Sequence, residues 1–178
     1  MIVRVGGIAG VGKTTVISKL LAVAQQNGIF LQEAPIREIL RELAGVQTAE
    51  EYKALSEEIR GSFYPESERR IYQLDREDPN VIRIHDGRFS FFNRSSGQYR
   101  IRPVQSDDKE RLLAVSVLTA DPRTILTRRI NEFPKRNDRH LLGINTLRER
   151  QEKEIKTALL QAEWLGVPIK ILRNDYNN

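Results

Sequence analysis

The chain has 178 residues, of which 39% are hydrophobic, enough for one substantial core and too few for two ordinary domains. It contains no cysteine, which excludes a disulfide framework and a thiolate zinc site. No apolar run approaches the roughly 20 residues that a membrane span requires, and the first residues lack the pattern of a signal peptide. These features predict a single domain in a cytoplasmic protein without a membrane partner.

The chain is basic, with a net charge of +5, while aromatic residues make up only 7%. A positive balance serves either nucleic acid or a pocket that gathers two polyphosphates. The basic residues are spread along the sequence and do not form a tail. The composition therefore favours the pocket and leaves nucleic acid as a less favoured partner, with the oligomeric state open.

A glycine-rich stretch from Gly6 to Val16, GGIAGVGKTTV, carries the clearest signal of function. Within it, four residues fit the pattern G-x-x-x-x-G-K-[ST] between a short apolar strand and a helix: Gly7, Gly12, Lys13 and Thr14. Glycines let several backbone N–H groups surround a phosphate, and the new helix adds the positive end of its dipole. The lysine supplies charge near the terminal phosphates, and the threonine hydroxyl can ligate magnesium. We therefore expect this loop to bind a nucleoside triphosphate.

After a short strand expected at Ile29–Leu31, the sequence from Pro35 to about Glu77 is heavily charged, with apolar residues at helical spacing. A capping box at Thr48–Glu51 and a proline at Pro65 mark helix starts within it. The strand pattern returns only after this stretch. Residues 36–77 are therefore expected to form a helical insertion between two core strands.

The next strand is expected within Asn80–Arg88, and it ends near His85 and Asp86. An aspartate at the carboxyl end of a core strand can hold a magnesium-bound water or a substrate group. The alternative is a structural Asp-Gly turn. The histidine could assist proton handling or serve only as a hydrogen-bonding turn residue. Ser90–Gln105 is expected to form a loop or hairpin.

The second half of the chain alternates strands and helices. Leu113–Thr119 is the most apolar strand, and Asp121-Pro122 would cap and open the following helix. Residues 133–143 are polar and basic. A second capping box at Thr146–Glu149 predicts the start of a long helix, and Val167–Leu172 the last strand. Five strand-like segments alternating with helices predict an α/β fold with a parallel sheet covered on both faces.

Arginines fall in two segments on either side of the predicted site. Arg136 and Arg139 lie in the basic segment, where a lid could fold over the triphosphate, and Arg37 and Arg41 lie in the helical insertion. Phosphoryl transfer needs two phosphate-bearing groups held in line and positive charge over the transferring group. Each arginine taken singly could equally be solvated surface. Arg4 interrupts the first strand, and we expect it to snorkel from the sheet end away from the nucleotide.

The order of these elements resembles that of an archaeal-type adenylate kinase, within the P-loop nucleoside monophosphate kinases. The resemblance covers nearly the whole chain and is carried by the P-loop, the charged insertion, HDGR, ADPRTILTRRI, FPKRNDRH, a long helix and VPIKILRND. It implies a three-layer α/β/α fold with a five-stranded parallel sheet, a helical acceptor-binding insertion and a short lid. It also implies ATP with Mg²⁺ as the donor system and phosphoryl transfer to a nucleoside monophosphate, with AMP favoured.

The resemblance further implies roles for residues around the donor nucleotide. The donor phosphates would be held by seven loop residues, Gly7, Gly10, Val11, Gly12, Lys13, Thr14 and Thr15. Arg128 or Arg129 would lie by the donor base, and Arg173 with Asn174 would border the donor adenine.

Catalysis and acceptor binding involve a second set of residues. Lys13, Arg136 and Arg139 would act on the transferring phosphoryl group, and magnesium would be ligated by Thr14 and Asp86. The acceptor would be bound by three residues, Arg37, Asp86 and Arg88.

The chain departs from this family at two places that bear on the acceptor. The archaeal family usually ends its third strand in Asp-Thr-His, whereas His85-Asp86-Gly87-Arg88 is similar to the Asp-Gly-Arg of cytidylate kinases. Residues 91–102 are also more basic and aromatic than the family's short stretch. CMP or another small metabolite is therefore the alternative acceptor. An RNA-associated P-loop ATPase is the alternative from another class, supported only by the positive charge.

Overall fold

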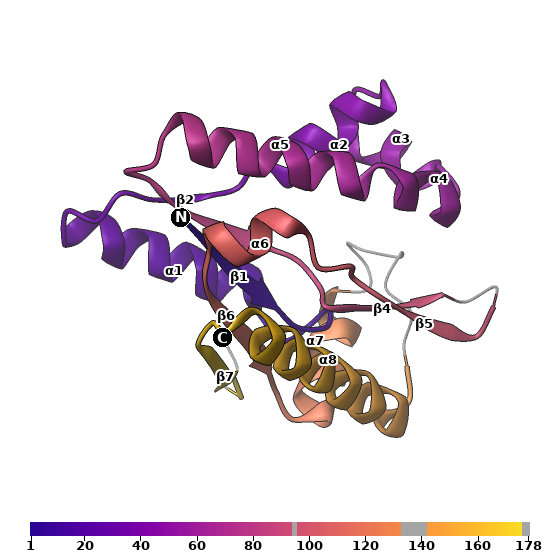
Figure 1. Cartoon of the computed structure of the whole chain (residues 1–178). Helices are drawn as coiled ribbons and strands as arrows, with labels where there is room; N and C mark the ends of the chain where they lie inside the picture. Colours follow the sequence, from indigo (N-terminus) through magenta and orange to yellow (C-terminus); the bar gives the residue numbers. More distant parts are fainter. Residues whose placement is uncertain (94–95, 133–141, 176–178) are drawn as a thin grey trace.

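A computed structural model of the chain describes residues 1–93, 96–132 and 142–175. At its centre lies a five-stranded parallel sheet with the strand order β2-β3-β1-β6-β7 (Figure 1). In chain order its strands are β1 (Ile2–Gly6), β2 (Leu31–Glu33), β3 (Ile82–Asp86), β6 (Leu112–Thr119) and β7 (Ile169–Arg173). The carboxyl ends of all five strands meet at one edge of the sheet, where α/β proteins bind ligands.

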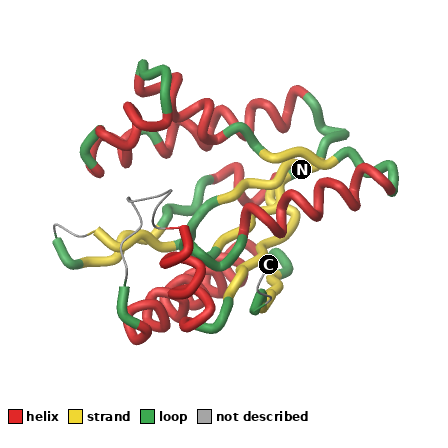
Figure 2. The backbone as a smooth tube through the Cα atoms, turned by 180° about the vertical axis from the view of Figure 1, so that it is seen from behind, coloured by secondary structure: helices red, strands yellow, loops and turns green. Residues whose placement is uncertain are grey.

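Helices cover both faces of this sheet. Two helices, α1 (Lys13–Gln26) and α7 (Pro122–Glu132), pack on the face seen in Figure 2, and α8 (Ile144–Leu165) packs on the face seen in Figure 1. The core accordingly divides into two clusters, because alternate residues of a strand point to opposite faces. This is the expected three-layer α/β/α fold of P-loop proteins.

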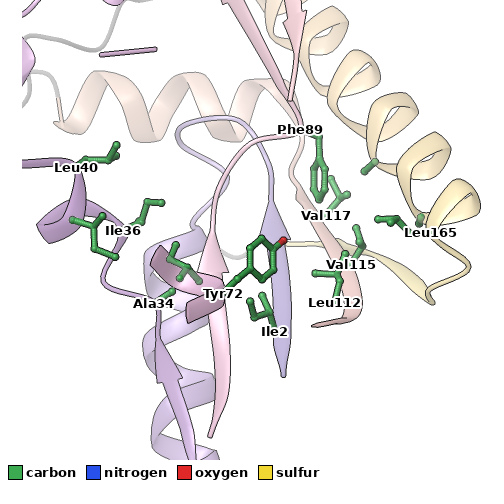
Figure 3. Close-up of a cluster of buried hydrophobic side chains, with 14 residues drawn as sticks. Ile2, Ala34, Ile36, Leu40, Tyr72, Phe89, Leu112, Val115, Val117 and Leu165 are labelled. Carbon is green, nitrogen blue, oxygen red and sulfur yellow. The ribbon is translucent and has the colours of Figure 1, made fainter. Parts of the chain in front are cut away.

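Four helices fill the stretch between β2 and β3, as expected for residues 36–77. They are α2 (Ile36–Ala44), α3 (Ala49–Ala54), α4 (Glu57–Ser62) and α5 (Tyr64–Glu77). The capping box at Thr48 is formed, with both of its hydrogen bonds to Glu51. An apolar stripe on α2 and two residues of α5 join the same core cluster as α8 (Figure 3). This packing ties the inner side of the helical stretch to the sheet.

A hairpin separate from the main sheet follows β3. It consists of β4 (Ser90–Asn93) and β5 (Gln98–Ile101), which pair antiparallel, and it confirms the expected loop or hairpin over residues 90–105. Between the hairpin and β6, α6 (Ser106–Arg111) crosses back towards the middle of the sheet (Figure 1).

Three predicted element starts are wrong. The last strand, expected from Val167, begins at Ile169. The strand expected from Ile29 begins at Leu31, because Ile29 and Phe30 are exposed and lie outside the strand. The last long helix begins at Ile144, with Gly143 as its N-cap, so Thr146 lies inside the first turn and caps nothing. In all three cases the hydrogen-bonded backbone sets where the element begins, and the side-chain pattern alone does not show this boundary.

Arg4 is the largest correction to the fold expected from the sequence. Its side chain is 1% exposed and does not reach the sheet end. One guanidinium nitrogen, Nη2, lies 2.5 Å from Asp108 Oδ1 of α6 and donates to the Tyr72 hydroxyl of α5 at 3.0 Å. The Tyr72 hydroxyl itself donates to the same carboxylate. A buried charge must be paired and hydrogen-bonded, so this contact fixes α5 and α6 on the middle of the sheet.

Candidate active site

The glycine-rich loop joins β1 to α1 at the carboxyl edge of the sheet. Three of its glycines, Gly7, Gly10 and Gly12, have φ angles of 132°, 94° and 90°, in the region that side chains rarely adopt. At Gly7 a Cβ atom would also lie only 2.5 Å from the Leu118 carbonyl oxygen. The N-cap of α1 is Gly12, so no side chain covers the first amides of the helix. The loop therefore has the features of a phosphate cradle.

Lys13 lies between this loop and the end of β3. Its Nζ donates to the Gly7 carbonyl at 2.6 Å and lies 3.9 Å from Asp86 Oδ1. Both side chains are mostly buried, at 13% exposed each. The lysine is thus held over the loop, where it would meet the phosphates of a bound nucleotide.

Asp86 also contacts the helical stretch on the other side of the site. Its Oδ2 lies 3.4 Å from Nη2 of Arg37, which lies in the first turn of α2 and is largely exposed. One carboxylate therefore lies between a lysine of the P-loop helix and an arginine of the helical stretch. Arg41, by contrast, pairs with Glu38 of its own helix at 3.5 Å.

The donor set at this edge fits a magnesium ion that is bound mainly by phosphates. Thr14 is exposed on the first turn of α1 and Asp86 ends β3. In residues 1–93, 96–132 and 142–175, no group of three or more His, Cys, Asp or Glu side chains could hold a metal. Magnesium commonly uses one or two protein oxygens plus substrate phosphates and water, which matches a hydroxyl and a carboxylate beside a phosphate loop.

Three residues that the resemblance places by the donor base, Arg128, Arg129 and Asn174, brace the loop through hydrogen bonds to its carbonyls. Arg129 donates to the Ala9 carbonyl through Nε at 3.1 Å and Nη2 at 2.7 Å. Arg128 donates to the Gly10 carbonyl at 3.4 Å and to the Asn174 carbonyl at 3.0 Å. The Asn174 amide in turn donates to the Val11 carbonyl at 2.8 Å. These contacts occupy carbonyl groups of the loop and none of its N–H groups.

Arg173 is not part of this brace. Its exposed side chain pairs with Asp175, two residues further along the chain. Val11 is buried within the loop, whereas Thr15 is half-buried on the first turn of α1. The predicted donor residues thus fall into three groups: those in the loop, those that hydrogen-bond to its carbonyls, and the exposed Arg173.

Arg88, expected to bind the acceptor, acts electrostatically on Tyr64 of α5. Burial raises the pKa of the Tyr64 hydroxyl, and the charge of Arg88 partly opposes this shift. The Tyr64 ring of α5 lies 5.6 Å, centroid to centroid, from Phe91 of β4. The Tyr64–Phe91 contact therefore joins the helical stretch to the hairpin, and the charge of Arg88 acts on the Tyr64 hydroxyl.

His85 does not face solvent, so it is not the accessible proton carrier considered from the sequence. Its side chain is 5% exposed, and it pairs with Arg4 in the register of β1 and β3. Burial, with a smaller contribution from the Arg4 charge, lowers the pKa of His85 to about 3. The ring is therefore neutral at neutral pH.

Glu154 is a buried residue of this region that no sequence motif indicates. It comes from α8, and its carboxylate accepts hydrogen bonds from the loop and from the start of the hairpin. A signal was present, because Glu154 falls in the 3–4 spacing of the buried face of α8, with Leu147, Gln151, Ala158 and Leu165. A carboxylate at a buried position of a helix indicates a specific hydrogen-bond partner.

Arg136 and Arg139, together with residues 133–141 of the predicted lid, lie outside the described residues. Their roles stay predictions from the sequence. Within the part of the chain that the structure describes, no helix has the length and apolar character needed to cross a membrane.

No model of a known protein family matches the chain, and no curated protein is significantly similar to it. Among solved structures, a shikimate kinase from Bacteroides thetaiotaomicron is similar, with a TM-score of 0.48 and 17% sequence identity. The match covers 98% of this chain and 86% of that one. The P-loop α/β fold of the present chain is shown by its own loop geometry and strand order.

Proposed function

We propose that the protein transfers a phosphoryl group from ATP, bound with Mg²⁺, to a nucleoside monophosphate, with AMP as the preferred acceptor. The observation that carries this proposal is the row Lys13–Asp86–Arg37, at 3.9 Å and 3.4 Å. It joins a phosphate loop to a cation of the helical stretch across one carboxylate. Two phosphate-bearing ligands, one on each side, would meet at this row, as phosphoryl transfer requires.

Each residue of the row has a distinct task in this proposal. The loop amides orient the donor phosphates, and Lys13 offsets the charge that develops on the transferring group. Arg37 binds the acceptor phosphate, for which it is exposed in the free protein. Magnesium would supply additional charge neutralisation on the donor phosphates. Asp86 holds both cations in place and provides an oxygen for the metal or its water.

The proposal assigns residues 1–178 to a single cytoplasmic kinase domain, residues 36–77 to acceptor binding and residues 133–143 to a lid. Arg136 and Arg139 would then cover the transferring phosphoryl group and exclude water. The braces Arg128 and Asn174 would keep the loop in its phosphate-binding form.

CMP is the second candidate acceptor, and a specific observation supports it. Arg88 completes an Asp-Gly-Arg sequence that starts at the last residue of β3, and its charge acts on Tyr64, whose ring contacts Phe91. Aromatic faces and a guanidinium suit a small planar base. The RNA-associated ATPase rests on net charge alone, and a kinase for another small metabolite is compatible with the same row of charges.

A screen of acceptors tests the proposal. The protein is incubated with ATP, Mg²⁺ and one acceptor at a time, and ADP production is measured for AMP, CMP, GMP, UMP and non-nucleotide acceptors. We expect the largest acceptor-dependent rate with AMP. ATP hydrolysis at the same rate with every acceptor and with none would contradict a kinase, and binding to single-stranded RNA that persists at moderate salt would favour the ATPase alternative.

A further inference from the structure

We propose that Glu154 couples the two halves of the candidate active site, so that a nucleotide bound at the phosphate loop stiffens the segment around Asp86 and Arg88. This inference rests on the proposed function, because it takes the loop as the donor site and that segment as the acceptor side. Glu154 acts as a positioning residue, through its hydrogen bonds to the phosphate loop and to the segment that follows Arg88.

The carboxylate is buried and fully engaged. Glu154 is 1% exposed, and each of its oxygens receives two donors. Oε1 accepts from the Gly7 N–H at 3.1 Å and the Phe89 N–H at 2.9 Å. Oε2 accepts from the Ser90 N–H at 2.8 Å and the Ser90 hydroxyl at 2.7 Å. A buried carboxylate is stable in this position because all four of its contacts are donors.

The four donors come from the two segments that the proposal connects. Gly7 opens the phosphate loop, and Phe89 and Ser90 directly follow the Asp86–Arg88 stretch. The two segments are 82 residues apart in sequence, since 89 minus 7 is 82. They share a single oxygen, so a movement of the Gly7 amide changes the hydrogen bond available to the Phe89 amide.

The side chains around these hydrogen bonds are closely packed. Phe89 is fully buried between the sheet and α8 (Figure 3). A Cβ atom at Gly6 would lie 2.2 Å from the Phe89 ring and 3.2 Å from Glu154 Oε1. The strand end, the ring and the carboxylate are therefore in contact. Close-packed groups transmit a displacement, because they have no empty space into which to relax.

Glu154→Gln is the most specific perturbation. An amide keeps the shape of the side chain but offers only one acceptor oxygen. Whichever way it is turned, its NH₂ group meets a backbone N–H, either at Ser90 or at the shared position of Gly7 and Phe89. Ser90→Ala removes one donor of the four and should give an intermediate effect.

Thr157→Val provides the matched control. Thr157 lies one turn further along α8 and is 3% exposed. Its hydroxyl donates to the Lys153 carbonyl of the same helix at 2.8 Å and, among the described residues, makes no hydrogen bond to either loop. The variant therefore perturbs a buried polar group of the same helix without altering the proposed connection.

Hydrogen exchange of single amides, followed by NMR with and without magnesium and the ATP analogue AMP-PNP, tests the coupling. In the wild-type protein we expect the analogue to slow exchange of the Phe89 and Ser90 amides at least about fivefold, and in Glu154→Gln less than about twofold. The Thr157→Val protein should behave as the wild type. With an acceptor that is turned over, Glu154→Gln should also lower kcat about tenfold while KM for ATP stays within about threefold.

The possible failures are separable. Protection of residues 7–15 with unchanged exchange at residues 86–90 in the wild type would overturn the coupling and leave the phosphate loop as the donor site. Equal coupling in wild type and Glu154→Gln would assign the carboxylate to stability alone. Coupling without turnover of any acceptor would refute the proposed kinase activity and retain the connection. Protection of neither segment would overturn both ideas.

Discussion

Lys13 Nζ and Asp86 Oδ1 lie 3.9 Å apart, which places the first turn of the P-loop helix against the end of β3. The contact brings together residues 73 positions apart in the sequence, since 86 minus 13 is 73. Parallel pairing of β1 and β3 makes this possible, because both strands end at the same edge of the sheet.

Replacement of Lys13 by Ala should lower kcat at least about a hundredfold if the ammonium stabilises charge in the transition state. The fold should persist, because the side chain contacts the loop carbonyl and Asp86 and is not part of either hydrophobic cluster. ADP production with ATP, Mg²⁺ and AMP measures the rate, and circular dichroism checks the fold. Lys19→Ala, on the exposed side of the same helix, is the control. Unchanged turnover in folded Lys13→Ala would refute the mechanism.

Asp86→Asn should reduce activity most at low magnesium, and added metal should restore part of it, if the carboxylate binds the metal or its water. The variant also weakens the hold on Arg37, so a moderate rise in KM for AMP is expected. Rates measured over a magnesium series at fixed ATP separate the two effects. A defect that does not depend on magnesium would limit Asp86 to orienting Lys13 and Arg37.

Arg136→Ala and Arg139→Ala should each reduce kcat much more than they weaken ATP binding, because a lid makes its contacts chiefly in the transition state. This prediction comes from the sequence, since both residues lie outside the described part of the chain. Initial rates at saturating substrates and direct titration with AMP-PNP provide the two numbers. Weaker ATP affinity with an unchanged kcat would show a passive binding surface.

Arg4→Met should lower the free energy of unfolding by about 3–5 kcal/mol, because it leaves the Asp108 carboxylate buried without its cation. Arg4→Met combined with Asp108→Leu should be less destabilising than the sum of the single changes, since both charges are then removed. Urea unfolding followed by circular dichroism gives the three values. Simple additivity of the two changes would mean that the pair is not coupled.

Protein stability should fall in acid through His85. Its native pKa of about 3 lies below the ordinary value of 6.5, so between these values the unfolded state binds more protons than the native state. The contribution of this residue is complete above about pH 6.5 and is lost as the pH falls towards 3, by up to about 1.4 kcal/mol per unit. Urea unfolding at several pH values should show a shallower acid slope for His85→Gln than for the wild type. Equal slopes would contradict the assignment.

Much of the fold could be predicted from the sequence because its signals are local. The glycine loop, the cap at Thr48 and the alternation of strands and helices depend on residues a few positions apart. The cap at Asp121 is also formed, with the Arg123 N–H donating to its carboxylate at 2.8 Å. These features appear in the structure where the pattern placed them.

The partners of Arg4 and Glu154 could not be predicted in the same way. Arg4 pairs with a residue 104 positions away, and Glu154 accepts from an amide 147 positions away. Three of the four donors to Glu154 are backbone N–H groups, which leave no trace in residue identity. A polar residue on the buried face of a helix or strand indicates that it has a partner. Only the topology of the fold shows which residue that partner is.

The brace between Asn174 and Val11 has a consequence for synthesis of the chain. The two residues are 163 positions apart, so the loop is synthesised well before the amide that hydrogen-bonds to it. At ordinary elongation rates the delay is roughly 8–30 s. During that time the nascent chain carries a glycine-rich segment without its brace. If the loop binds ATP as proposed, the full form of its site is therefore reached only after β7 has joined the sheet.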